Sequence, residues 1–208
     1  MPVPFPAYAG SAKIGVLPDL GVASARSEGG LVVTSRKSDP FWSGSLTTIK
    51  LEPWQGGNRH AQFLAFLSRC VDLNLRVDWV PPRHRLPGAY TAQTWPLIGD
   101  CSLVDVPDQR TLRVGGMQAG LVLSAGDRVA VLQGDSVVHR WVAEDVIVSS
   151  AIAQNIAVTP RLPIGLLAPA AVVKLKDPVL RFMVEPGSWD THEASEPTAI
   201  TFSVMEAV

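Results

Sequence analysis

The residues that could carry chemistry in this sequence are dispersed. The four histidines stand alone, with no other histidine, cysteine or carboxylate at a metal-ligand spacing: His60, His84, His139 and His192. No serine lies in a Gly-x-Ser-x-Gly nucleophile elbow. Glu144 and Asp145 are adjacent, so in a strand they would point to opposite faces and could not act as a pair. We therefore expect no catalytic, cofactor-binding or metal-binding residue and no enzymatic activity.

Two further features could still suggest chemistry. The glycine-rich segment Gly115–Gly120 could cradle a phosphate, but it lacks the Lys-Ser/Thr pair of a P-loop and no helical pattern follows it. It is interpreted as a turn. Cys70 and Cys101 are isolated, which is typical of a reducing compartment and not of a disulfide framework. A peptidase would have to use Cys101 with a histidine that the fold brings close, and this is the one enzymatic alternative.

The composition indicates many short elements and few charges. The chain has 208 residues, of which 18% are charged, against roughly 25% in ordinary domains. Either other chains cover part of the surface, or the protein is a well-packed β fold with many turns. The 17 glycines and 17 prolines are spread along the chain, which favours an all-β fold. The net charge of −1 is unlike that of a sequence-reading nucleic-acid binder, although a protein that merely surrounds a nucleic acid is compatible with it.

The N-terminus lacks the basic start and apolar core of a signal peptide, and no run of 18 apolar residues predicts a membrane span. Residues 1–12 carry three prolines and are expected to be extended, and ordered only if something covers them. A Leu-Pro-Asp-Leu-Gly turn is expected between Ala12 and Val22.

The stretch Leu123–Pro160 is the clearest β signal. Three β-branched runs are separated by Gly-Asp, Gly-Asp-Ser and Ala-Gln-Asn, which predicts short antiparallel strands joined by tight turns. The last strand carries an apolar face of Ile200, Phe202 and Val204. The strands expected outside the central stretch are Leu31–Thr34, Trp42–Leu51, Leu75–Trp79, Leu103–Val106, Thr111–Val114, Val172–Lys176, Leu180–Val184 and Ala199–Glu206.

One amphipathic helix is expected. Asn58 is a suitable N-cap after two glycines, and the apolar positions that follow recur at three- and four-residue spacing until about Leu73 or Asn74. From Arg59 to Tyr90 there are five arginines against two aspartates. This local excess is either a solvated surface or one that meets acidic neighbours or a phosphate backbone. The tryptophans are scattered singly, as core or interface anchors are, while a sugar-stacking platform is the sharper alternative.

The order of several motifs resembles a known family. They are Asp39–Gly44, the helix Gln62–Leu67, Leu-x-x-Gly-Asp-x-Val at Leu123–Val129, Val138–Arg140, Val158–Leu162, Lys176–Pro178, Arg181-Phe182 and the last strand Phe202–Glu206. Together they resemble the distal tail and tail-assembly proteins of long-tailed, siphovirus-type bacteriophages and phage-like tails. The resemblance extends from about Phe41 to Val208.

The resemblance implies an all-β fold with one helix. Residues 1–97 and 177–208 would form a ring-forming, tail-tube-like β-sandwich flanked by the helix, and residues 98–176 an inserted small β-barrel. The residues expected at subunit interfaces are Trp42, Phe63, Phe66, Trp79 and Phe202.

The function implied is that of a structural virion protein of the tail tip, assembled in the host cytoplasm. A homohexameric ring would join the tail tube protein to the hub proteins of the tip or baseplate. The genome would pass through the lumen without sequence-specific binding, and no cofactor is implied. The alternative is a carbohydrate- or receptor-binding module of a tail tip, with Trp141 or Trp95 as the stacking surface.

Overall fold

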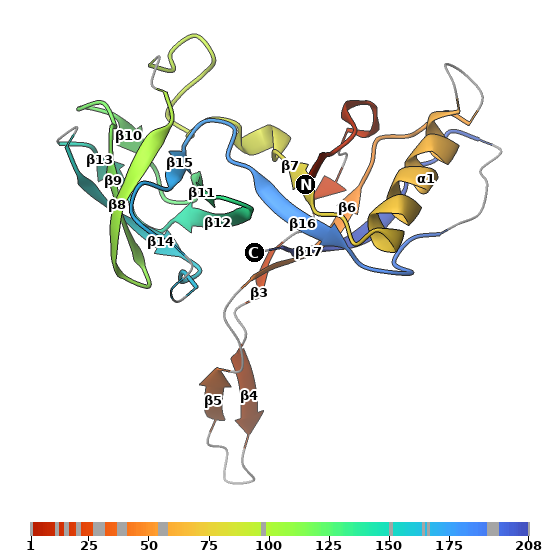
Figure 1. Ribbon diagram of the computed structural model, residues 1–208, viewed down its shortest axis with the longest axis horizontal. Coiled ribbons are helices and arrows are strands. Elements are labelled where there is room, and N and C mark those ends of the chain that lie inside the picture. Colours follow the sequence, from red (N-terminus) through yellow and green to blue (C-terminus); the bar gives the residue numbers. More distant parts are fainter. Residues whose placement is uncertain are drawn as a thin grey trace.

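The computed structural model describes residues 2–10, 13–14, 17–19, 22–26, 32–36, 41–53, 58–96, 99–149, 152–163, 165, 167–190 and 196–207. These residues form a seven-stranded sheet with one α-helix and a closed six-stranded barrel beside it (Figure 1). The predicted all-β fold with one helix and a small barrel is confirmed.

Distant parts of the chain build the sheet. The strand order is β1-β7-β16-β17-β6-β2, with β3 also paired to β6. All neighbours are antiparallel except β1 and β7, which are parallel. The bounds are β1 Val3–Pro4, β2 Lys13–Ile14, β3 Leu17–Asp19, β6 Phe41–Thr47, β7 Val77–Trp79, β16 Leu180–Val184 and β17 Thr201–Glu206.

The expected Leu-Pro-Asp-Leu-Gly turn is wrong for Leu17–Asp19, which form strand β3 on β6, and the rest of that motif lies outside the described residues. Pro18 sits in this short strand at the margin of the sheet, where a missing N–H is tolerated. The N-terminal segment is packed on the rest of the chain, but it is not extended throughout as expected, because Ala7–Ala9 form the short 3-10 helix η1. The Val3 N–H donates to the Arg76 carbonyl at 2.9 Å, and the Phe5 ring packs edge-on against Phe63.

Helix α1 (Arg59–Asp72) packs on one face of the sheet. Its buried positions follow the three- and four-residue spacing of a helical stripe: His60, Phe63, Leu67 and Cys70. The predicted cap is present, since the Asn58 side chain accepts a hydrogen bond from the Ala61 N–H at 3.0 Å. Phe202 and Val204 of β17 point to the same core, so the predicted apolar face of the last strand is also confirmed.

The barrel closes in the order β11-β12-β14-β9-β8-β15. Its strands are β8 Cys101–Asp108, β9 Thr111–Gly115, β11 Arg128–Gln133, β12 Ser136–Val142, β14 Gln154–Thr159 and β15 Val172–Lys174. A small pair, β10 (Val122–Leu123) and β13 (Val146–Ile147), lies beside it. The three strands predicted within Leu123–Pro160 are β11, β12 and β14, each antiparallel to the next. A two-residue turn at Gly134-Asp135 joins the first two and fixes their register.

Strands β4 (Val22–Arg26) and β5 (Val32–Arg36) form a separate two-stranded sheet. Figure 1 shows this hairpin extending away from both the sheet and the barrel. The sequence predicted a strand at Leu31–Thr34 but not its partner. The partner was missed because Ala-Ser-Ala at its centre has little β-propensity.

Candidate functional site

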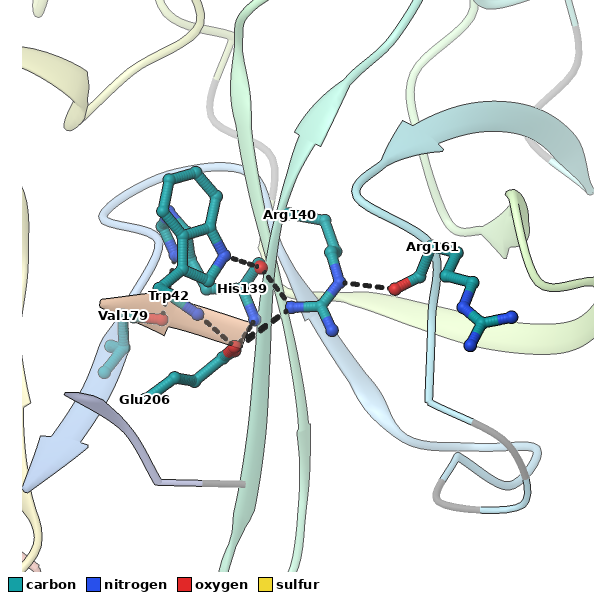
Figure 2. A network of polar contacts seen from close by, with 6 residues as sticks. All are labelled: Trp42, His139, Arg140, Arg161, Val179 and Glu206. Atoms are coloured by element: carbon teal, nitrogen blue, oxygen red, sulfur yellow. Dashed lines mark hydrogen bonds and ion pairs between the residues drawn. The ribbon is translucent and has the colours of Figure 1, made fainter. Parts of the chain in front are cut away.

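The site with the most unusual chemistry is the joint between the sheet and the barrel, shown in Figure 2. Strand β12 of the barrel brings His139 and Arg140, strand β6 brings Trp42 and strand β17 brings Glu206. Both faces of β12 are covered at this point, since Val138, His139 and Arg140 are all buried. One strand therefore carries polar groups into an interior that has little access to water.

Glu206 is the centre of the joint. Its carboxylate accepts hydrogen bonds from the Trp42 N–H at 3.1 Å, the His139 N–H at 3.2 Å and Arg140 Nη1 at 3.1 Å. The side chains of Arg140 and Glu206 are 1% and 0% exposed. A charge this deeply buried is tolerated only when it is paired and its lone pairs are filled, and these three donors meet that condition.

The network continues through backbone carbonyls into the barrel. The His139 carbonyl accepts from Trp42 Nε1 and from Arg140 Nη1, and Arg140 Nε donates to the Arg161 carbonyl at 3.2 Å. Arg161 lies just beyond the end of β14. The hydrogen bonds thus link two sheet strands, one barrel strand and the segment after β14. This linkage restrains both position and rotation of the barrel against the sheet.

Burial sets the protonation of the joint. Burial, together with the charge of the nearby Arg128 guanidinium, lowers the pKa of His139 to about 3, so the ring is neutral at pH 7. Nδ1 lies 3.1 Å from the Val179 carbonyl, which can only accept, so Nδ1 carries the hydrogen. Burial raises the pKa of Glu206, while Arg140 and the two backbone N–H donors act in the opposite direction. The sequence predicted a partly buried or edge histidine, whereas the structure places His139 at 1% exposure.

An arginine and two indoles extend the joint. The Arg128 guanidinium carbon lies 4.7 Å from the ring centroids of both Trp42 and Trp141. The two indoles meet edge to face with centroids 4.8 Å apart. Trp141 is half-buried, whereas Trp95 is only 8% exposed. Trp95 therefore offers little open face on which a sugar could stack.

The five residues expected at subunit interfaces lie elsewhere than expected. Four are buried within the single chain and Phe66 is half-buried. Trp42 belongs to the joint, while Phe63, Phe66 and Phe202 form one cluster of aromatic rings in the core under α1. Trp79 lines the same core. The four buried residues have almost no surface left for another chain, whereas Phe66 keeps some.

The residues considered for catalysis are not brought together. Burial raises the pKa of the Cys101 thiol and Asp100 raises it further, which disfavours the reactive thiolate. His60 is buried in α1 and His84 lies in the short helix η2 (Pro82–His84), while His192 lies outside the described residues. Within the described ranges, no three His, Cys, Asp or Glu residues are grouped so that they could hold a metal ion. No helix in this part of the chain is long and apolar enough to cross a membrane.

The sequence did not single out Glu206 and Arg140. A signal was present, because Glu206 continues the alternation of Phe202 and Val204 and so falls on a buried face. Arg140 likewise interrupts an otherwise apolar run. A charge at a core position of a strand indicates a buried partner, although it does not say which residue that partner is.

Two comparisons with known proteins complete the description. No protein-family model matches the chain, and no curated protein matches it.

Proposed function

We propose that this chain is a structural subunit of a phage-type tail, forming a homohexameric ring at the distal end of the tail tube. In this role it joins the tube protein to the hub proteins of the tip or baseplate, and the genome passes through its lumen. The protein has no catalytic activity and resides in the virion. The observation that carries the proposal is the combination of a rigidly held inserted barrel with a hairpin that extends away from the body. The ordered motifs that resemble distal tail proteins support the same role.

The joint gives the subunit a fixed shape. A connector between two assemblies has to present two surfaces at a constant angle, and a buried network of hydrogen bonds fixes such an angle better than apolar packing alone. Here the sheet and the barrel share the Arg140–Glu206 ion pair and the carbonyl of His139. Both chain ends contribute to the sheet, so the barrel is held from the sheet side by Trp42 and by Glu206, two residues 164 positions apart.

The hairpin supports contact with a second chain. An isolated two-stranded hairpin is marginally stable in water, because it buries little apolar surface. Strands β4 and β5 pair only with each other among the described strands, so their outer edges are open. Open edges are usually covered in native assemblies. A neighbouring subunit of the ring would supply that cover.

On the face turned away from α1, the charges of the sheet lie on strands other than β6 and β17, such as the Arg181–Asp78 pair of β16 and β7. On β6 and β17 the positions that alternate with the buried ones carry serine, threonine and methionine: Ser43, Ser45, Thr47, Thr201, Ser203 and Met205. Interface cores between proteins are likewise depleted in charged residues. The low charged content of the whole chain, 18%, agrees with a protein that works inside an assembly.

Mass photometry of the purified chain tests the proposal. We expect a species of about six times the mass of the 22.3-kDa chain. A variant in which residues 22–36 are replaced by a short Gly-Ser linker should retain its helix by circular dichroism, because α1 and its core lie outside the hairpin. Its oligomer should be weaker and should therefore dissociate at a higher protein concentration than the wild-type oligomer does. A wild-type chain that remains monomeric at all concentrations would overturn the proposal.

A further inference from the structure

The guanidinium of Arg128 is held against two indoles at the edge of the joint. It begins β11, opposite Trp141 on β12, and its guanidinium carbon lies 4.7 Å from the centroids of Trp42 and Trp141. The two indoles hold the flat group in position by cation–π attraction. The planes of the two indoles lie at 87° to each other, so the guanidinium can lie face-on to at most one of them. Its N–H groups still need hydrogen-bond acceptors.

Those N–H groups have no acceptor among the described residues. Nε is buried without a hydrogen-bond partner. Arg128 as a whole is half-buried, so part of the residue keeps contact with solvent. The carboxylate next in the sequence, Asp127, is already engaged by the Gly88 N–H and the Ser124 N–H, each at 2.7 Å. Arg128 is therefore a half-buried cation with no counter-charge in the described part of the chain.

A second arginine lies nearby. Burial lowers the pKa of His84 in η2, and the charges of Arg128 and Arg83 lower it further while Asp127 acts in the opposite direction, so the His84 ring is neutral at pH 7. Burial alone lowers the pKa of Arg128 to about 10, and no carboxylate offsets that effect. Arg140, the other guanidinium nearby, is occupied by Glu206. An anion brought to Arg128 would therefore relieve a desolvation cost that the chain itself leaves in place.

We propose that Arg128 anchors a carboxylate-binding site at the edge of the joint, and that an acidic side chain of a partner protein fills it. A planar carboxylate matches the two-pronged N–H geometry of a guanidinium, and such bidentate pairs are strong and directional. A nucleic acid is the less suitable ligand, because its backbone is bound by rows of cations and this chain has a net charge of −1. The proposal concerns this surface alone and holds whether or not the chain forms a ring.

Titration of the intact chain with a hexaglutamate peptide tests the site. The readout is tryptophan fluorescence together with the indole N–H resonances of Trp42 and Trp141, which flank the guanidinium. Arg128→Gln removes the charge, and Arg128→Lys keeps a charge over the indoles but loses the fork. Arg113→Gln is the matched control, since it removes the same charge from a barrel strand at an exposed pair with Asp105. Acetate and a short DNA duplex are titrated in parallel.

We expect saturable binding of the peptide, weakened at least about tenfold by Arg128→Gln and by less than about twofold by Arg113→Gln. Arg128→Lys should also weaken binding of the peptide. If Arg128→Gln does not fold, the affinity of the Arg128→Lys variant tests the site in its place. The absence of saturable peptide binding, or equal binding by both Arg128 variants and wild type, would overturn the site. Acetate binding as tight as peptide binding would overturn the protein partner in favour of a small carboxylate. DNA binding that depends on Arg128 and exceeds peptide binding would overturn it in favour of a nucleic acid.

Discussion

Replacing Glu206 with glutamine tests whether the joint holds the sheet and the barrel together. The amide has nearly the same shape as the carboxylate but no charge. The substitution would leave Arg140 buried without its counter-ion. The amide NH2 group would also replace one carboxylate oxygen, and it would face N–H donors at a point where they need an acceptor. The Trp42 N–H and the His139 N–H both need an acceptor at this point.

The expected cost follows from the burial of the pair. The two side chains are 1% and 0% exposed, so solvent cannot take over the lost interaction. Removing one partner of a buried ion pair costs about 3–5 kcal/mol in the free energy of unfolding. For a chain of this length that corresponds to a fall in melting temperature of roughly 6–20 °C. Replacing Arg140 and Glu206 together with methionine and leucine should recover only part of the loss, because no charge is then left unpaired but the Trp42 and His139 N–H groups still lack an acceptor.

Urea denaturation followed by circular dichroism and by tryptophan fluorescence measures the effect. The wild type should unfold in one transition by both probes, whereas Glu206→Gln should unfold at lower urea, with the two probes separating if the barrel and the sheet come apart independently. Asp105→Asn is the matched control, because it breaks an exposed pair in the barrel and should cost less than about 1 kcal/mol. A Glu206→Gln protein within about 1 kcal/mol of the wild type would refute the reasoning.

Three further predictions concern the core, the buried histidine and the helix cap. Phe63→Ala should cost about 3–5 kcal/mol by thermal melting, because the ring is 0% exposed, and Phe66→Ala, at a half-buried neighbour, should cost less. The pKa of His139 is lowered to about 3 in the folded chain, so only the unfolded chain takes up its proton below about pH 6.5. Stability should therefore fall as pH decreases from about 6.5 towards 3, and His139→Phe should flatten that fall; parallel pH profiles would contradict this. Asn58 has a φ of 49° and caps α1. Asn58→Ala should lower the free energy of unfolding by about 1–2 kcal/mol and Asn58→Gly by less. Equal losses in the two variants would contradict the role of Asn58 as the helix cap.

The local parts of this fold could be predicted from the sequence. The helix has a cap and a regular apolar stripe, and the barrel strands β11, β12 and β14 are separated by turn residues that the chain needs at those points. Each of these signals lies within a few residues of the structure that it produces. Several short strands were missed. One of them, β4, has Ala-Ser-Ala at its centre and is recognisable only through its pairing with β5.

The joint could not be predicted because its partners are remote in the sequence. Arg140 and Glu206 are 66 positions apart, and Trp42 and Glu206 are 164 apart. Pattern reasoning identifies a charge on a buried face but cannot choose among many possible partners. The same limit explains why large aromatic residues such as Phe63 and Trp79 were assigned to a subunit interface. An aromatic side chain is equally suited to an interface and to a core, and only the packing of the whole chain decides between them.

Negative-stain electron microscopy of the purified protein tests the proposed ring most directly. The proposal predicts closed rings with a central hole of about 20 Å or more, wide enough for a DNA duplex. In averaged images, each subunit should show two lobes in a constant relative orientation, because the buried Arg140–Glu206 network fixes the barrel against the sheet. Images that contain only single, monomer-sized particles at micromolar concentrations would contradict the proposal.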